Sequence, residues 1–191
     1  KELEKEKKNL EILLQASQEL GNSLKLEDTY EVINRMIKKL VSCQTCIVFL
    51  IKDVEGEPQL VAEEVTGPYR EYVFTVKTFP ISASETIVGW VASERKPYFI
   101  KDTEIEKNPP PMIRYERSEM AVPLISKDEC IGVIYVGQQK ASAFTHDDLN
   151  LLSTLANQTS IAVTNAKLYE KTHNMATTDG LTGLYTHRYF Q

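Results

Sequence analysis

One long helical segment near the C-terminal end of the sequence constrains the fold more than any other feature. It begins at Thr145, whose hydroxyl can cap the first turn while the Asp148 carboxylate reaches back, and acidic side chains suit this end of a helix dipole. Apolar residues then recur at helical spacing along two stripes. They are Leu151, Leu155, Ile161, Leu168 and Met175 in one, and Leu152, Leu155, Ala162, Ala166, Tyr169 and Ala176 in the other. Two stripes predict a helix over 145–178 that packs on its own subunit and on a partner, with a single broad buried face as the alternative.

The composition sets the scale of the fold. The 191 residues suit one domain with helical extensions, and a hydrophobic content of 42% is enough for a core. The formal net charge of −5 argues against nucleic acid as a partner. No apolar run is long enough to cross a membrane, and no signal peptide opens the sequence. Because Lys1 stands first, we expect the sequence to be part of a longer protein.

Three cysteines, Cys43, Cys46 and Cys130, bear on the chemistry. Cys43 and Cys46 have the C-x-x-C spacing of redox and zinc sites. No second pair and no nearby histidine completes a tetrahedral set of four ligands, so no metal site is predicted. The pair leads directly into the apolar run 47–51, which favours small buried side chains at the start of a strand. Unpaired thiols fit a reducing compartment, and we expect a cytoplasmic protein.

The rest of the sequence predicts two further helices and a sheet. Residues 1–20 form a charged helix whose leucines lie near heptad spacing, which indicates a neighbouring helix. A second helix, 27–40, has an inner face made of Tyr30, Ile33, Ile37 and Leu40. A short helix is expected at 86–92. Apolar or alternating runs predict strands at 46–51, 60–65, 72–76, 97–100, 119–125 and 130–138.

An irregular segment, 103–118, separates the fourth strand from the fifth. Its run of prolines, 109–111, cannot sit inside a helix or a strand ladder. The terminal helices can cover only one face of the sheet, so this segment and the short helix must cover the other, which leaves a pocket between. The candidate pocket residues are Tyr72, Phe74, Trp90, Arg114, Tyr115, Arg117, Ser118, Met120 and Tyr135. Arg114, Tyr115, Arg117 and Trp90 are suited to an anionic or aromatic ligand; two solvated arginines and a core tryptophan are the alternative.

Several short motifs, in this order and spacing, resemble the GAF domain. They are Gly89-Trp90-Val91-Ala92, Lys96-Pro97-Tyr98, Val122-Pro123-Leu124, Ile131-Gly132-Val133-Ile134, and Phe144 with the helix residues from Asp148-Leu149 to Leu168-Tyr169. The resemblance covers about 20–169. It implies an α+β fold of GAF-like or PAS-like type, with a six-stranded antiparallel sheet, terminal helices on one face and ligand-pocket loops on the other.

The same resemblance implies a homodimer built by the terminal helices. The residues expected in that interface are Leu10, Leu13, Leu155, Ile161, Leu168 and Met175. The expected organisation is a coiled-coil or dimer helix at 1–20, a GAF domain at 21–169 and a linker helix at 170–178. A ligand would act by favouring one arrangement of the paired helices, to the extent that its affinity for the two states differs.

The last residues resemble a second family. Asp179-Gly180-Leu181-Thr182-Gly183-Leu184 and Arg188-Tyr189-Phe190 are similar to the opening of the GGDEF domain, the diguanylate cyclase module, with Thr186 in place of the usual Asn. This resemblance implies a bacterial parent protein that makes cyclic di-GMP from GTP with Mg²⁺. Residues 179–191 are only the truncated start of that module and lack its signature. We therefore expect these 191 residues to be a sensor and dimerisation module rather than an enzyme.

The ligand is not identified by the sequence. Lys140, Phe144 and Asp148 match the Asn-Lys-Phe-Asp-Glu pattern of cyclic-nucleotide-binding GAF domains, but Gln139 and Leu149 replace its first and last residues. That ligand is therefore less favoured. A dimerisation module without any ligand is the other alternative.

Other GAF chemistries fit less well. A bilin needs a cysteine in the loop region, and none lies between Cys46 and Cys130. A haem needs an axial histidine, but His146, His173 and His187 lie in or after the long helix. The related enzyme free methionine sulfoxide reductase carries cysteines in its pocket-covering loops, which is not the distribution here.

Overall fold

The computed structural model of the chain describes residues 2–23 and 25–177. The predicted GGDEF opening at 179–191 lies outside these residues, as does the side chain of Met175, an expected interface residue.

The structure confirms an α+β fold built on one six-stranded antiparallel sheet with the order β3-β2-β1-β6-β5-β4. The elements in chain order are α1 (Glu2–Asn22), α2 (Leu26–Leu40), β1 (Thr45–Val54), β2 (Glu57–Thr66), α3 (Arg70–Val76), β3 (Thr78–Pro80), α4 (Ile87–Glu94), β4 (Tyr98–Ile100), β5 (Ser118–Ser126), β6 (Glu129–Gln138) and α5 (His146–Thr177). The first and last long strands, β1 and β6, lie side by side in the middle of the sheet.

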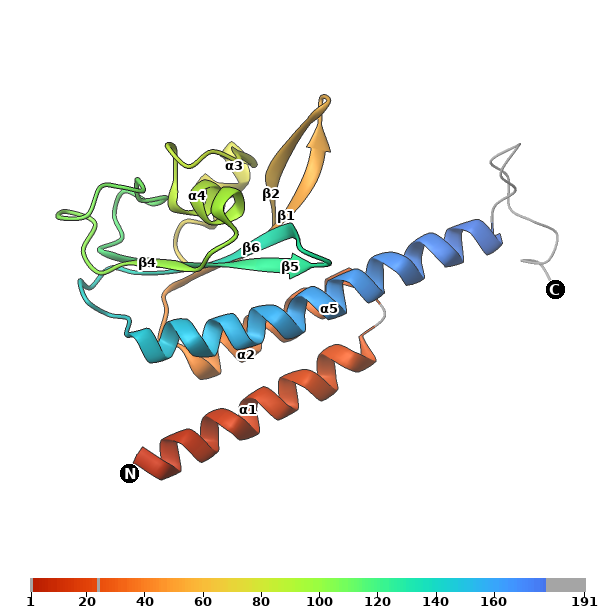
Figure 1. Ribbon diagram of the computed structural model, residues 1–191, viewed down its shortest axis with the longest axis horizontal. Coiled ribbons are helices and arrows are strands. Elements are labelled where there is room, and N and C mark those ends of the chain that lie inside the picture. Colours follow the sequence, from red (N-terminus) through yellow and green to blue (C-terminus); the bar gives the residue numbers. More distant parts are fainter. Residues whose placement is uncertain (1, 24, 178–191) are drawn as a thin grey trace.

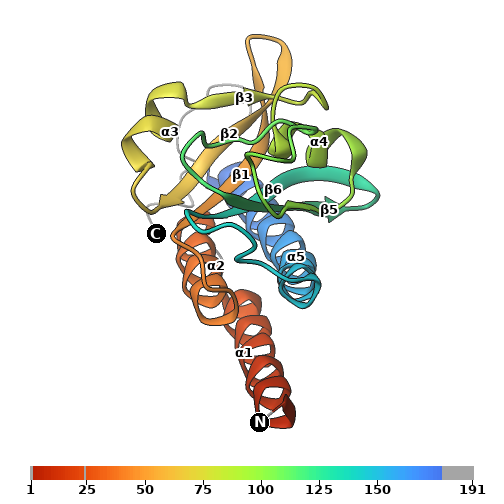
Figure 2. The ribbon, with the colours of Figure 1, turned by 90° about the vertical axis from the view of Figure 1, so that its left-hand side faces the viewer.

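The long helices form two layers on one face of the sheet. Figures 1 and 2 show α2 and α5 directly beneath the strands, and α1 beneath these two helices, farther from the sheet. Their shared core contains Ile33 and Ile37 from α2, Leu152 from α5 and Met120 from β5, all fully buried. Burying each such side chain contributes about 1.5–3 kcal/mol relative to leaving it in water. Within residues 2–23 and 25–177, no helix combines the length and the apolarity that a membrane span needs.

The predicted start of α5 is confirmed in detail. The backbone N–H of Thr145 donates to Asp148 Oδ2 at 2.8 Å, and the backbone N–H of Asp148 donates to Thr145 Oγ1 at 3.2 Å. Each side chain thus satisfies an otherwise unpaired amide at the other residue, which fixes where the helix begins.

The prediction of a strand at 72–76 is wrong. These residues form the short helix α3, in which Val73 is buried and the Thr75 hydroxyl donates to the Glu71 carbonyl one turn back. The edge strand is β3, which pairs with β2 just after α3. Aromatic and β-branched residues favour strands only weakly, and packing across the open face of the sheet stabilises a helix here instead.

The apolar residues of α5 divide between a buried and an exposed face, but Tyr169 leaves its predicted stripe for the exposed face, and the side chain shared by both stripes, Leu155, belongs to the core. It is fully buried with Leu152 against the sheet. The exposed face carries Ile161 (65% exposed), Leu168 (57%) and Tyr169 (47%). Leu155 is therefore a core residue of this subunit and cannot reach a partner.

The leucines of α1 also divide between two faces. Leu20 is buried and Leu13 packs partly against the core, whereas Leu3 and Leu10 are 78% and 67% exposed. The inner face of α1 is instead formed by Ile12, Ala16 and Leu20, together with Leu13. Leu13 therefore contacts its own subunit, and Leu14, 62% exposed, joins Leu10 on the outside.

Candidate functional site

A cavity of about 600 Å³ lies on the sheet face opposite α2 and α5, between α3 and the segment 101–117. Its lining residues are Tyr69, Tyr72, Thr103, Glu104, Lys107, Pro111, Met112, Ile113, Arg114, Tyr115 and Arg117. The cavity thus brings together Tyr72, Arg114, Tyr115 and Arg117 from the residues that the sequence singles out. Its size is in the range of small-molecule sites in proteins.

Two predicted pocket residues lie outside the lining of this cavity. Phe74 projects from α3 and is covered by the Arg70 guanidinium, 5.5 Å from its ring centroid. Trp90 is half-buried on α4 and packs against Tyr98, with ring centroids 5.0 Å apart. Trp90 packs against the core on this side of the sheet, whereas Phe74 is exposed on α3.

Three further predicted residues lie in the sheet itself. Ser118 is buried, and its hydroxyl donates to the Ile100 carbonyl at 3.1 Å. Met120 packs in the core on the helix side, so its expected place at the pocket is corrected: successive residues of a strand point to opposite faces. Tyr135 is on the cavity side but fully buried beneath it.

The segment 101–117 is held by hydrogen bonds to its own end and to β6. The Thr103 backbone N–H donates to the Arg117 carbonyl at 3.0 Å, and the Thr103 hydroxyl donates to the Glu116 carbonyl at 2.6 Å. The Arg117 N–H donates to the Gln138 carbonyl at 2.9 Å. These bonds make the segment a fixed wall of the cavity despite its lack of regular structure.

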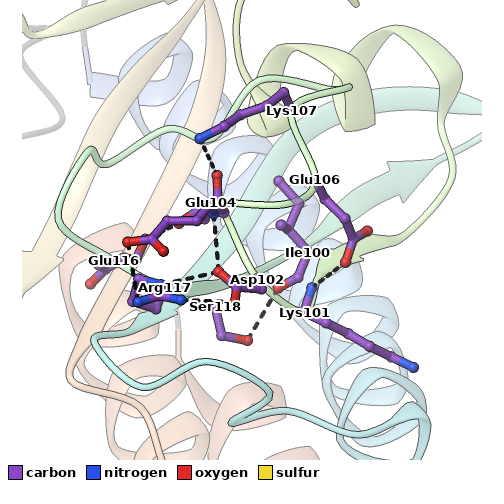
Figure 3. Close-up of polar contacts among 10 residues, drawn as sticks. Ile100, Lys101, Asp102, Glu104, Glu106, Lys107, Glu116, Arg117 and Ser118 are labelled. Carbon is purple, nitrogen blue, oxygen red and sulfur yellow. Dashed lines mark hydrogen bonds and ion pairs between the residues drawn. The ribbon is translucent and has the colours of Figure 1, made fainter.

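Arg117, at the end of this wall, is paired with two carboxylates (Figure 3). Arg117 donates through Nε to Asp102 Oδ1 at 3.0 Å and through Nη2 to Oδ2 at 2.8 Å, and its Nη1 lies 3.2 Å from Glu104 Oε1. These hydrogen bonds hold the pKa of Asp102 below its usual value. The same bonds raise the pKa of Arg117 above its usual value. Arg117 therefore fastens the loop, because its donors are directed at protein carboxylates.

The other two cations of the lining differ in their surroundings. The Lys107 ammonium donates to the Thr103 carbonyl within the same segment. Arg114 is exposed and forms no ion pair with any residue of the described ranges. Among the described residues, Arg114 is thus the cation of the lining without a protein partner, while Lys107 has one.

Two tyrosines face each other across the cavity. The rings of Tyr69 and Tyr115 are nearly parallel, 15° apart, with centroids separated by 6.5 Å. Gln139 Nε2 donates to the Tyr69 hydroxyl at 3.1 Å, which orients that ring from the end of β6. The sequence analysis missed Tyr69, because a tyrosine after Gly67-Pro68 reads as part of a turn.

Two buried carboxylates support the cavity from below, and both were missed. Glu119 on β5 is fully buried and accepts from the backbone N–H groups of Met112 at 2.8 Å and Ile113 at 2.7 Å, two residues of the cavity wall. Glu116, also fully buried, accepts a hydrogen bond from the Tyr135 hydroxyl. Burial raises the pKa of Glu119 to about 7, and burial raises the pKa of Glu116 as well.

The glycine at 137 makes room for one of these carboxylates. A Cβ atom at Gly137 would lie 1.5 Å from Glu116 Oε2, much closer than any non-bonded contact. Glu119 pairs with Gly137 across β5 and β6, so the absent side chain opens space on this face of the sheet. The only signal in the sequence was a pair of acidic residues beside an otherwise apolar strand.

The cysteines lie away from the cavity. Cys46 is buried in the helix-side core at the start of β1, as its sequence context predicts. Burial raises the pKa of Cys43 to about 11 and also raises the pKa of Cys46 and of Cys130. Among the described residues, no group of three or more His, Cys, Asp or Glu side chains is placed to hold a metal ion.

Comparison with known proteins finds one family over most of the chain. The sequence model of the GAF domain matches residues 23–164. The chain is also 35% identical over 72 residues to the uncharacterized protein YtrP of Bacillus subtilis; this match spans 38% of the chain and 12% of YtrP.

Solved structures support the same fold. The GAF domain of an Acinetobacter phosphoenolpyruvate-protein phosphotransferase superposes with a TM-score of 0.70 at 20% identity, over 85% of this chain and 97% of that one. The corresponding GAF domain from Coxiella burnetii gives 0.70 at 20%, over 86% and 97%. Free methionine-R-sulfoxide reductase from Neisseria meningitidis, solved with its substrate, gives 0.68 at 18%, over 84% and 90%. At these identities the likeness concerns the fold alone.

Proposed function

The chain belongs to the GAF domain family, and we propose that it is a regulatory sensor that binds a small molecule in the cavity between α3 and the segment 101–117. The observation that carries this proposal is the construction of the cavity wall. Met112 and Ile113 line the cavity, and their backbone amides are held by the fully buried Glu119. A buried carboxylate is costly to maintain, and here it fixes the wall of a cavity rather than a surface loop.

Strand β5 is the proposed route from the cavity to the signalling helix. Glu119 holds the cavity wall on one face of β5, while its neighbour Met120 packs against the helices on the other. At the far end of the strand, the Thr164 hydroxyl of α5 donates to Ser126 Oγ at 3.1 Å. A ligand that shifts the wall would move β5 and bias α5, by at most its difference in affinity for the two arrangements.

We also propose that the chain forms a homodimer through its exposed helix faces. Leu10 and Leu14 on α1, and Ile161 and Leu168 on α5, are each more than half exposed. Leu10 and Leu14 are four residues apart and Ile161 and Leu168 are seven, so each pair shares one face of its helix, which suits an interaction surface. The sensor would then act by changing how the two α5 helices lie against each other.

The proposed output is a diguanylate cyclase. The resemblance of residues 179–190 to a GGDEF opening supports this, because α5 leads directly into them. Two such modules must face each other to join two GTP molecules, so the spacing of paired α5 helices would control the reaction.

The described residues themselves are proposed to be non-catalytic, with a cytoplasmic location. A thiol enzyme needs a thiolate, and burial raises the pKa of all three cysteines. None of the residues lining this cavity is a cysteine.

The experiment that tests the sensor proposal is thermal unfolding of the purified chain in the presence of the small molecules that pass a dialysis membrane from a bacterial extract (the metabolite fraction). A ligand in the cavity raises Tm in wild type. Glu104→Trp, which places an indole in the cavity, removes that rise, while Glu71→Trp, an exposed position on α3 outside the lining, keeps it. A rise of equal size in both variants places the ligand elsewhere, and no rise at all favours a dimerisation module without a ligand.

A further inference from the structure

We propose that the cavity takes a planar aromatic anion, with its ring between Tyr69 and Tyr115 and its anionic group at Arg114. This inference rests on the proposed sensor function and names the chemical class of its ligand. It is carried by the two rings, by an arginine of the lining without a protein partner among the described residues, and by the absence of an available carboxylate in the lining.

The two tyrosine rings form the walls of a slot. They are 15° from parallel, and their centroids lie 6.5 Å apart, near the upper end of the ~4.5–7 Å range over which aromatic rings attract each other. A flat ring inserted between two others needs about 7 Å, twice the ~3.5 Å contact distance of carbon atoms. The 6.5 Å between centroids combines the spacing of the two planes with any lateral offset, so the position of the Tyr115 ring sets the width that a ligand ring meets.

The two tyrosine rings differ in how they are held. Tyr69 is half-buried and oriented by Gln139, whereas Tyr115 is 69% exposed on the irregular segment. A small rotation of Tyr115 admits a ligand against the fixed ring of Tyr69. Tyr72, which also lines the cavity, adds a third aromatic side chain from α3.

The charges of the lining select an anion. Lys107, Arg114 and Arg117 stand against Glu104 as the only acidic side chain of the lining. Arg117 is occupied by Asp102 and Glu104, and Lys107 donates to a backbone carbonyl. Lys107 keeps two further N–H groups, but Arg114 has no protein partner among the described residues, and its planar guanidinium can donate two parallel hydrogen bonds to a carboxylate or phosphate.

The same inventory argues against a cationic ligand. Glu104 lies 3.2 Å from Arg117 and is already paired. Glu116 and Glu119 are fully buried below the cavity and are not among its lining residues. A cation would thus meet paired or buried carboxylates and the positive charge of Arg114.

The test is a titration of the ¹⁵N-labelled chain with matched acids. The aromatic probes are benzoate, 2-naphthoate and anthracene-2-carboxylate, each compared with its fully saturated counterpart, and 2-naphthamide serves as the uncharged probe. We expect at least one aromatic acid to shift the backbone amides of residues 112–117. The saturated counterpart of that acid should bind at least tenfold more weakly. In the naphthyl series, 2-naphthamide should also bind at least tenfold more weakly than 2-naphthoate.

Variants separate the two recognition elements. Tyr115→Leu weakens binding of the aromatic acid at least tenfold. Arg114→Gln abolishes the preference for the acid over the amide. Phe74→Leu, which removes an aromatic ring of α3 outside the cavity lining, leaves binding unchanged. Tyr115 and Arg114 are both exposed, so neither change threatens the core.

Three outcomes overturn the inference: equal binding of aromatic and saturated acids, full affinity in Tyr115→Leu, or no shift at residues 112–117 with any aromatic acid. If the metabolite fraction still stabilises wild type but not Glu104→Trp, the sensor proposal survives and only this ligand class is rejected. If that stabilisation is absent too, both proposals fall.

Discussion

The buried carboxylate of Glu119 makes the stability of the fold depend on pH in a direction opposite to that of most carboxylates. Its pKa is raised from the ordinary 4.5 to about 7, chiefly by burial. Below the ordinary value the group is protonated in both the folded and the unfolded chain. As pH rises through this window, the unfolded chain releases the proton first, so the folded state loses stability.

The size of the effect follows from the shift. The difference between about 7 and 4.5 corresponds to about 3 kcal/mol, at ~1.4 kcal/mol for each pKa unit. The raised pKa of Glu116 acts in the same direction. The lowered pKa of Asp102 acts in the opposite direction, but that contribution is lost only below its ordinary value of 3.8, outside the window from pH 5 to pH 8.

The assay is urea unfolding at pH 5 and pH 8, followed by Trp90 fluorescence at one protein concentration. At pH 5 an unfolded carboxyl with the ordinary pKa of 4.5 is already mostly ionised, so wild type is expected to lose at least about 2.5 kcal/mol of unfolding free energy between the two values. Glu119→Gln cannot ionise, so its loss should be smaller by about 2.5 kcal/mol. Glu129→Gln, at an exposed position at the start of β6, should behave as wild type. If Glu119→Gln keeps the full wild-type loss, the assignment to Glu119 is refuted.

Three further predictions concern packing. Gly137→Ala places a methyl group against Glu116 and should lower the free energy of unfolding by about 1–3 kcal/mol, measured in urea; an unchanged value means that the carboxylate moves freely. Leu168→Glu should weaken the dimer at least tenfold in sedimentation velocity, whereas Ile105→Glu, at a more exposed apolar residue off the helices, should not; equal effects argue against the α5 face. Leu155→Ala should instead destabilise the subunit by about 2–5 kcal/mol in urea, and a dimer defect without loss of stability would contradict its core position.

Local signals in the sequence were sufficient for α1, α2, α4, α5 and most strands. The capping pair Thr145 and Asp148 fixed the start of α5, and the spacing of Tyr30, Ile33 and Ile37 gave the inner face of α2. The prediction for residues 72–76 failed because their composition favours a strand. Packing over the open face of the sheet instead stabilises a helix there.

The cavity was harder to predict than the sheet. Strand β5 is buried on both faces, so no alternation of polar and apolar residues reveals that Glu119 points to the cavity and Met120 to the helices. The pairing of Tyr69 with Tyr115 joins residues far apart in the sequence. Such contacts depend on strand register and loop path, which a single sequence does not display.

Native mass spectrometry of the purified chain tests the central claim, a small molecule in the cavity of a dimeric sensor, because it reports subunit number and bound mass together. The account predicts a dimer that carries a discrete extra mass, one per subunit, and that loses it in Glu104→Trp. A monomer, or an added mass that persists unchanged in Glu104→Trp, would contradict it.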